Sequence, residues 1–227
     1  MTKEEATRFR AIAARLNYMT HDRPDIAVAA MRLCSRMAEP TRDDWAAMMR
    51  VGRYLIGLPR VCYRYGWQSP QSGIEVFSDS DWAGDRATRR STSGGAIYHG
   101  NHLIRAWAKK QAVISLSSAE AELYAACKAA SEALGTQAYL RDLGAEAGVQ
   151  MHMDSSSALS LTSRAGLGKA KHIDIQWLWI QEAVEQGRIR CQKVPGDSNP
   201  ADLLTKHMAG DRIRYLMELL GFRYGSS

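Results

Sequence analysis

Four acidic residues lie at places in the chain where folding could bring them into one cleft. Asp79 and Asp154 follow strand-like runs, whereas Glu122 and Asp202 lie in the first turns of expected helices. Carboxylates that converge without cationic partners repel one another, so their charged forms are disfavoured. A hard divalent cation such as Mg²⁺ removes that penalty because it prefers oxygen ligands. The four residues therefore indicate metal-dependent phosphoryl transfer of the kind that nucleases perform.

The composition is that of a folded protein without a membrane-spanning segment. Of the 227 residues, 45% are hydrophobic and 24% are charged, and charges interrupt the apolar stretches well before the ~18 residues that a spanning helix needs. No apolar stretch follows the charged N-terminus, so we expect an intracellular protein, cytoplasmic or nuclear. The four cysteines form no Cys-x-x-Cys pair, which disfavours a zinc ribbon and predicts reduced, buried thiols.

Positive charge is concentrated in the first third of the chain. Residues 1–72 contain 12 Lys and Arg against 7 Asp and Glu, whereas residues 73–227 contain 18 against 17. A basic segment beside an acidic cleft suits a polyanionic substrate that touches both. A solvated, arginine-rich helical surface is the alternative interpretation of the same charges.

The first 70 residues are expected to form a helical segment. Thr2 and Glu5 have the spacing of a capping box before an apolar stripe, and Thr41 can cap a later helix. A further helix is expected between these two. A run rich in Gln, Ser, Pro and Gly then reads as a linker. We therefore predict a boundary near residue 70, between a helical connection segment (1–70) and a second domain (71–227).

The second domain is expected to mix strands with helices. Short apolar runs separated by turn residues predict three strands in an antiparallel meander, followed by a long helix. Strands and helices then alternate. The expected strands cover 74–77, 94–98, 103–107, 149–153 and 189–194, and the expected helices cover 118–134, 155–161, 172–186 and a last one from Asn199.

Five motifs follow one another in residues 74–208. They are 78–85 (SDSDWAGD), 90–95 (RSTSGG), 115–122 (SLSSAEAE), 171–175 (KHIDI) and 199–206 (NPADLLTK). Their content and order resemble the ribonuclease H domain of copia-type LTR retrotransposons. Residues 16–27 and 51–57 resemble the segment between polymerase and ribonuclease H in the same polyproteins, and no Tyr-x-Asp-Asp polymerase motif occurs. The resemblance implies the C-terminal part of a reverse transcriptase without its polymerase centre.

The resemblance implies an α/β fold: a ribonuclease H-like five-stranded mixed sheet with flanking helices, preceded by the helical segment. The family's four catalytic and metal-binding acids correspond here to Asp79, Glu122, Asp154 and Asp202. They are expected to bind two Mg²⁺ ions, with Mn²⁺ as a substitute. Asp79 would bridge the ions, with Asp81 as the alternative residue for that role. Asp154 would also suit a helix cap, and Asp202 a helix N-terminus.

The implied activity is cleavage of the RNA strand of an RNA–DNA hybrid into pieces with 5′-phosphates, with the polymerase portion as partner. Distinguishing RNA from DNA requires hydrogen-bonding groups near the 2′-hydroxyl, where Ser80 is a candidate. Basic residues are expected to contact the substrate without reading its sequence. These are Arg89, Arg90, Lys109, Lys110, Lys169, Lys171 and His172, the last with a structural role as its alternative. The loop 195–198 lacks the histidine that other ribonucleases H carry there.

Two other functions are compatible with the sequence. A non-catalytic module could bind nucleic acid or brace a polymerase, which the helical first third favours. A strand-transferring nuclease of the integrase type would share the cations but usually works with three acids and DNA alone. A pure scaffold has no need to gather four carboxylates, so the sequence favours the endoribonuclease.

Overall fold

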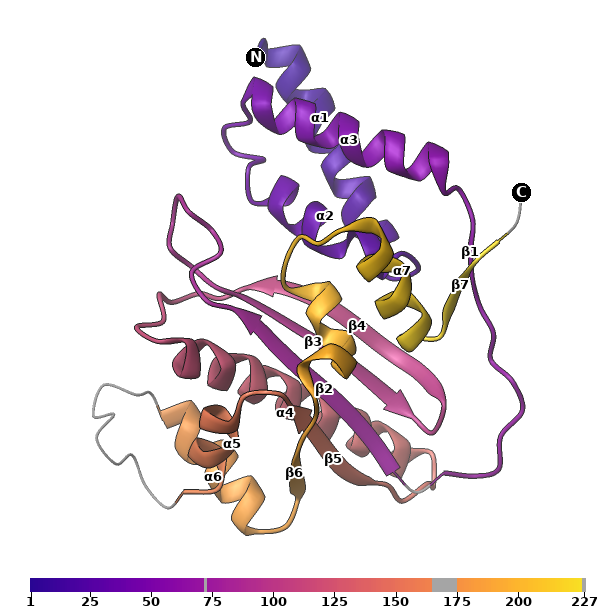
Figure 1. The fold of residues 1–227 in the computed structure, drawn as a ribbon, viewed down its shortest axis with the longest axis vertical. Helices are drawn as coiled ribbons and strands as arrows, with labels where there is room; N and C mark the ends of the chain where they lie inside the picture. The colour runs from indigo at the N-terminus through magenta and orange to yellow at the C-terminus, as the bar shows by residue number, and fades with distance from the viewer. Residues whose placement is uncertain (72, 165–174, 226–227) are drawn as a thin grey trace.

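A five-stranded mixed sheet forms the centre of the protein. The structure is a computed structural model that describes residues 1–71, 73–164 and 175–225. The strand order is β4-β3-β2-β5-β6, with β2, β3 and β4 antiparallel and β2, β5 and β6 parallel (Figure 1). The strands are β2 (Gly73–Asp81), β3 (Thr92–His99), β4 (His102–Lys110), β5 (Gly148–Met153) and β6 (Ile189–Lys193). The sheet confirms the predicted mixed α/β fold.

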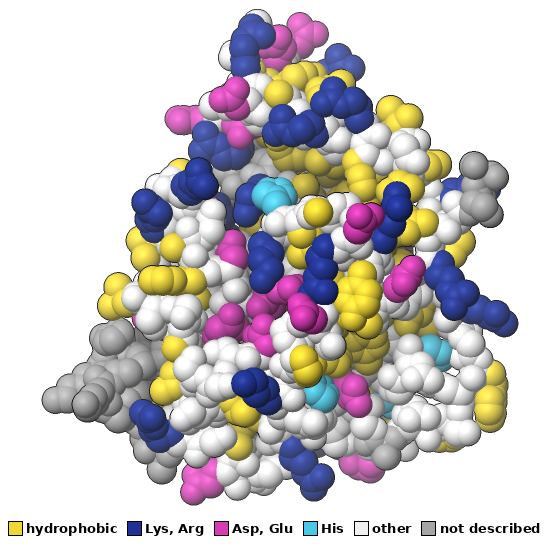
Figure 2. Space-filling model, viewed as in Figure 1, with side chains coloured by type: hydrophobic (Ala, Val, Ile, Leu, Met, Phe, Trp, Pro, Cys, Tyr) yellow, Lys and Arg dark blue, Asp and Glu magenta, His cyan; other side chains and the backbone are white. Residues whose placement is uncertain are grey.

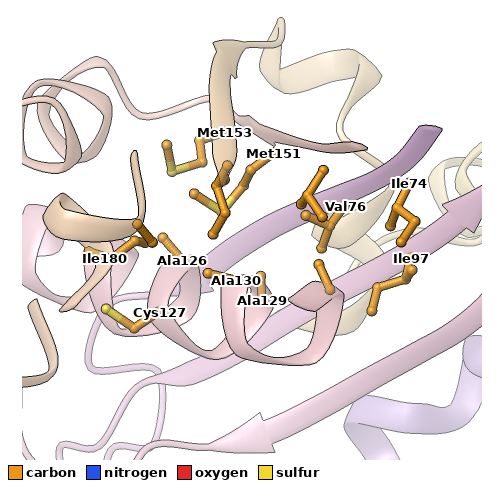
Figure 3. Close-up of a cluster of buried hydrophobic side chains, with 14 of the residues drawn as sticks. Ile74, Val76, Ile97, Ala126, Cys127, Ala129, Ala130, Met151, Met153 and Ile180 are labelled. Carbon is orange, nitrogen blue, oxygen red and sulfur yellow. The ribbon is translucent and has the colours of Figure 1, made fainter. Parts of the chain in front are cut away.

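Three helices cover one face of this sheet. The long helix α4 (Ser118–Asp142) packs with α5 (Ser156–Thr162) and α6 (Ile175–Glu185) over a core that includes Val76, Met151 and Ile180 (Figure 3). Five of the buried α4 residues in this core are alanine or cysteine with small side chains, so the helix approaches the sheet closely. Fully burying each large side chain of such a core contributes about 1.5–3 kcal/mol.

The opposite face carries a short 3-10 helix and one α-helix. These are η3 (Pro200–Leu204) and α7 (Gly210–Leu219), which lie in front of the sheet in Figure 1. The η3 turn comes so close to β3 that a Cβ on Gly94 would lie 2.7 Å from Thr205 Cγ2 and 2.8 Å from the Ala201 carbonyl oxygen. Only glycine permits this approach. The short helix is thereby held against the strand next to β2.

The helical segment has a core of its own. Its elements are α1 (Lys3–Met19), η1 (Pro24–Ile26), α2 (Ala27–Cys34) and α3 (Arg42–Gly57). The predicted capping box forms at Thr2 with Glu5, and Thr41, predicted as a helix cap, forms a second box with Asp44. Apolar side chains of these helices, including Phe9, pack together. Among the residues described, no helix combines the length and the apolar character needed to cross a bilayer.

The strand that follows the helical segment pairs with the last strand of the chain in a small second sheet. Strand β1 (Val61–Tyr63) pairs antiparallel with β7 (Phe222–Tyr224), at the end of the chain. Beside this pair, the Tyr54 hydroxyl donates to Asp25 Oδ2 at 2.7 Å and lies 3.3 Å from the Tyr224 hydroxyl. Asp25 also forms a buried ion pair with Arg23 at 2.8 Å. The helical segment and the C-terminus are therefore joined by backbone pairing and by a buried polar network.

The largest differences from the predicted elements concern β2, α4 and the last helix. Strand β2 continues through Asp81, so Asp79 lies within the strand and does not follow it. Helix α4 continues to Asp142 and not to residue 134, because Leu134 and Leu140 still pack against the core. The expected last helix from Asn199 is a short 3-10 turn, with α7 as a separate helix. The start of the helix predicted over 172–186 lies outside the described residues, which show α6 from residue 175.

Candidate active site

Three of the four predicted acids come together at one end of the sheet. Asp79 on β2, Glu122 on α4 and Asp154 just after β5 each offer a carboxylate oxygen, and these oxygens all lie within 4.8 Å of one another. The parallel neighbours β2 and β5 bring Asp79 and Asp154 to the same edge, because Ser78 is in register with Met153. The N-terminal part of α4 places Glu122 beside them. We call Asp79, Glu122 and Asp154 the acidic cluster.

The cluster is electrostatically strained without a bound cation. Asp79 is only 3% exposed, and this burial raises its pKa to about 7, with Asp202 and Asp154 adding repulsion. Burial raises the pKa of Glu122 to about 8, helped by the charges of Asp79 and Asp154. Burial and the charge of Asp202 also raise the pKa of Asp154. Full ionisation of the cluster near neutral pH therefore requires added positive charge.

Hydrogen bonds hold two members of the cluster in place. The Thr205 hydroxyl donates to Asp79 Oδ2, and the Ser80 N–H donates to Glu122 Oε1 at 3.3 Å. Asn199 Nδ2 donates to the Ser78 carbonyl oxygen at 3.0 Å, which ties the start of η3 to β2. Asn199 was expected only as a helix cap, a role it also fills because its Oδ1 accepts from the Ala201 N–H, and Thr205 was assigned no role. Both lie in the 199–206 motif, and that motif was the signal that could have identified them.

Asp202, the fourth predicted acid, is paired with basic side chains. Its carboxylate oxygens lie 2.6 Å from Lys206 Nζ and 3.2 Å from an Arg212 guanidinium nitrogen. Asp202 is close enough to raise the pKa values of Asp79 and Asp154, whereas Lys206 counteracts both increases. The expectation of four converging acids without cationic partners is thus corrected. Three form the cluster, and Asp202 lies at its edge with a lysine and an arginine.

Asp81, the alternative to Asp79, points to different partners. Its Oδ1 accepts a hydrogen bond from the Thr92 N–H, and its Oδ2 lies 3.9 Å from Arg32 on α2. Asp81 is not a member of the acidic cluster. Its carboxylate therefore connects β2 with β3 and with the helical segment.

The predicted substrate contacts fall into four groups. Arg89, Arg90 and Lys109 are exposed, as a phosphate contact requires, whereas Lys110 is ion-paired with Asp85. The Ser80 hydroxyl is buried without a hydrogen-bond partner, because strand alternation turns it away from the face that carries Asp79. This placement does not support the expected contact of that hydroxyl with a ribose. Lys169, Lys171 and His172 lie outside the described residues.

Charges of both signs surround the site. Figure 2 shows acidic side chains gathered near the middle of the visible face, with Lys and Arg side chains next to them and further basic groups towards the helical segment. Oxygen-only ligands at short mutual distance, with pKa values raised by burial and repulsion, fit a hard divalent cation. Asp79, Glu122 and Asp154 are the described residues that could hold it.

Comparison with known proteins identifies the family. The chain is 30% identical over 213 residues to the retrovirus-related Pol polyprotein from transposon TNT 1-94 of Nicotiana tabacum, covering 93% of this chain and 16% of the relative. It is 32% identical over 210 residues to the Pol polyprotein from transposon RE2 of Arabidopsis thaliana, covering 90% of the chain and 14% of the relative. The chain belongs to the retrovirus-related Pol polyproteins of copia-type transposons. No family model matches the chain.

A solved structure supports the fold of this Pol polyprotein segment. The foamy viral protease-reverse transcriptase in complex with an RNA/DNA hybrid is 13% identical, with a TM-score of 0.56 over 84% of the chain and 25% of that protein. The similarity extends beyond the sheet into the preceding helices, since the sheet region alone is shorter than the matched share. The sheet and its flanking helices thus have the ribonuclease H-like fold that the sequence predicted.

Proposed function

We propose that this Pol polyprotein segment hydrolyses the RNA strand of RNA–DNA hybrids during reverse transcription of its element. The observation that carries the proposal is the acidic cluster. Three carboxylates from β2, α4 and the end of β5 meet within 4.8 Å, and burial and mutual repulsion raise the pKa values of all three. A structural role gives no reason for such an arrangement, whereas a metal-dependent nuclease requires it.

Asp79, Glu122 and Asp154 would hold the divalent cations, for which we propose two Mg²⁺ ions. When bound, these ions would neutralise charge on the scissile phosphate and make water a stronger nucleophile. The protein's own part is to fix the ligands. Thr205 fixes Asp79 and the Ser80 amide orients Glu122. In-line hydrolysis at this site would leave a 5′-phosphate and a 3′-hydroxyl.

Exposed basic side chains of the sheet and its loops suit a nucleic-acid duplex. Arg89 and Arg90 in the β2–β3 loop and Lys109 on β4 are exposed and could bind phosphates without reading sequence. The chain spans only 14–16% of the length of the relatives named above, so we further propose that it acts together with the polymerase portion, inside the cell. Asp202, held at the edge by Lys206 and Arg212, would support the cluster without being a central ligand.

The proposal is tested with a labelled RNA–DNA hybrid beside duplex RNA and duplex DNA. We expect cleavage of the hybrid alone, in Mg²⁺ or Mn²⁺, and none in EDTA. Asp79→Asn should abolish cleavage and keep the fold, because it removes a negative ligand from the cluster. Asp142→Asn, at the exposed far end of α4, is the matched control and should cleave like wild type.

Two outcomes would count against the enzyme. Undiminished cutting by Asp79→Asn would exclude the acidic cluster as the catalytic site. Salt-sensitive hybrid binding without any cleavage would favour the alternative, a nucleic-acid-binding module that braces the polymerase. The pairing of β1, which follows helix α3, with β7 is the observation that favours this alternative, because it ties the helical segment to the C-terminal strand.

A further inference from the structure

One arginine outside the acidic cluster contacts two turns that border it. Arg212, in the first turns of α7, donates to Asp202 Oδ2 at 3.2 Å and to the Asp197 carbonyl oxygen at 3.0 Å, with a longer bond of 3.5 Å to the Gly196 carbonyl oxygen. Its side chain is 28% exposed. The planar guanidinium can serve several acceptors in fixed directions, which the single ammonium group of lysine cannot do. Arg212 thus links the turn 196–198 to η3.

The turn 196–198 lies directly against the acidic cluster. A Cβ placed on Gly196 would be 3.3 Å from Asp154 Oδ2, so the backbone of this turn borders the Asp154 carboxylate. The turn is a short 3-10 helix, η2 (Gly196–Ser198), and it leads directly into Asn199 and η3. A shift of this turn would move the backbone that lies against Asp154. It would also move the start of η3, which carries Asp202 and ends next to Thr205.

Helix α7, which carries Arg212, is itself firmly anchored. Leu216 and Met217 are fully buried in the core that covers the second face of the sheet. The helix is followed by β7, which pairs with β1. The Arg212 guanidinium also lies 5.2 Å from the centre of the Tyr215 ring. The arginine is therefore presented from a rigid support, as a positioning group must be.

We propose that Arg212 is a positioning residue of the active site, which holds the turn 196–198 beside Asp154 and Asp202 beside the acidic cluster. This inference rests on the proposed nuclease function. The guanidinium acts through the two elements that it fastens. Removing it leaves the three cluster ligands in the chain but loosens the backbone that borders one of them.

The test compares Arg212→Met and Arg212→Lys with Arg214→Met, which removes the same charge from an exposed position two residues on. We expect kcat of Arg212→Met on the hybrid to fall roughly 10–100-fold, as for other supporting groups at metal sites. The Kd of Arg212→Met for the hybrid, measured in Ca²⁺, should stay within about threefold of the wild-type value, because Arg212 is not one of the proposed phosphate contacts. Arg212→Lys should lie between wild type and Arg212→Met, and Arg214→Met should match wild type.

Hydrogen exchange supplies a readout that does not depend on activity. Amides of residues 196–205 should exchange faster in Arg212→Met than in Arg214→Met or wild type, while those of α4 stay unchanged. Wild-type kcat and wild-type exchange in Arg212→Met would overturn the proposal, as would a full rescue by lysine. A wild-type chain that fails to cleave hybrid would refute the proposed function, and the exchange measurement would still decide whether Arg212 holds the turn.

Discussion

The acidic cluster and η3, which carries Asp202, both contain carboxylate side chains, but in opposite electrostatic settings. In the cluster, Asp79, Glu122 and Asp154 face one another, and burial and repulsion raise their pKa values. Asp202 instead has Lys206 at 2.6 Å and Arg212 at 3.2 Å. The comparison shows that a carboxylate near the site is not a metal ligand merely because it is acidic. The carboxylates left without compensation are the ones that suit a metal.

The difference follows from the elements that carry these residues. The cluster acids come from β2, from α4 and from the end of β5, all elements of the central sheet and the helix packed on it. Asp202 lies on a short turn, with Lys206 four residues later and Arg212 on the next helix. Partners at such spacing are readily supplied by a local turn and an adjoining helix.

The largest expected effect is a loss of hybrid cleavage that differs between mutants of the two regions. Asp154→Asn should lower hybrid cleavage more than about 100-fold, which exceeds the usual loss for groups that only support a metal ligand. Asp202→Asn should lower it only about 10-fold, since its charge is already paired. Rates are compared at saturating Mg²⁺ on one hybrid. Equal losses in the two variants would break the distinction between the regions.

The second effect concerns stability and pH in the absence of metal. Asp79 and Glu122 have pKa values raised to about 7 and about 8, so the folded state binds protons that the unfolded state has already released above pH ~4. Their contribution to stability is therefore present below pH ~4 and is lost as the pH rises through 7 and 8. We expect the metal-free Tm to fall by several degrees over this range, and Mg²⁺ to raise it at pH 8 but little at pH 5.

Glu122→Gln provides the control for this titration. The variant cannot ionise at position 122, so its Tm should depend less on pH than that of wild type. Glu146→Gln, at an exposed position, should keep the wild-type pH dependence. A wild-type Tm that is flat between pH 5 and pH 8, with no response to Mg²⁺, would contradict the description of the cluster as uncompensated.

A smaller effect should come from the hydroxyl that fixes Asp79. Thr205 is fully buried and donates to Asp79 Oδ2, so Thr205→Val removes this bond with little change in volume. We expect cleavage to fall about 10-fold in Thr205→Val and to be largely retained in Thr205→Ser. Steady-state rates with both variants test this. An inactive serine variant would show that the methyl group, packed near Gly94, matters more than the hydroxyl.

The smallest expected effect is on metal affinity. Lys206 neutralises part of the charge felt by Asp79 and Asp154, so Lys206→Met should tighten Mg²⁺ binding roughly two- to tenfold when no nucleic acid is present. Calorimetric titration measures this directly. Lys128→Met, whose lysine pairs with Glu132 on α4, should bind Mg²⁺ like wild type. Weaker binding by Lys206→Met would mean that the lysine supports the cluster and does not compete with the metal.

The sequence predicted the sheet and the acids well where the signals were local. Alternating apolar runs marked the strands, the motifs identified Asp79 and Glu122, and the end of the expected strand 149–153 identified Asp154, before their proximity was known. The buried orientation of Ser80 could also have been predicted, because neighbouring residues of a strand face opposite sides and Asp79 faces the site. We took β2 to end before Asp79, and this shorter strand concealed the alternation.

The remaining features depend on contacts between distant parts of the chain. Arg212 reaches Asp202 from a helix that the sequence analysis did not separate from the preceding turn. Strands β1 and β7 have three residues each and lie about 160 residues apart, so neither shows a periodic pattern of its own. Such partners become visible only when the core has set the positions of both elements.

The pairing of β1 with β7 has a consequence for shortened copies of this chain. A product that starts at residue 71 would keep every acid of the site but leave Phe222 and Tyr224 without their strand partners. Tyr224 would also lose its neighbour Tyr54, and α7 would be tethered at one end only. Gene fragments and proteolytic products that contain every motif would thus expose an unpaired strand β7 beside the helix that holds Arg212.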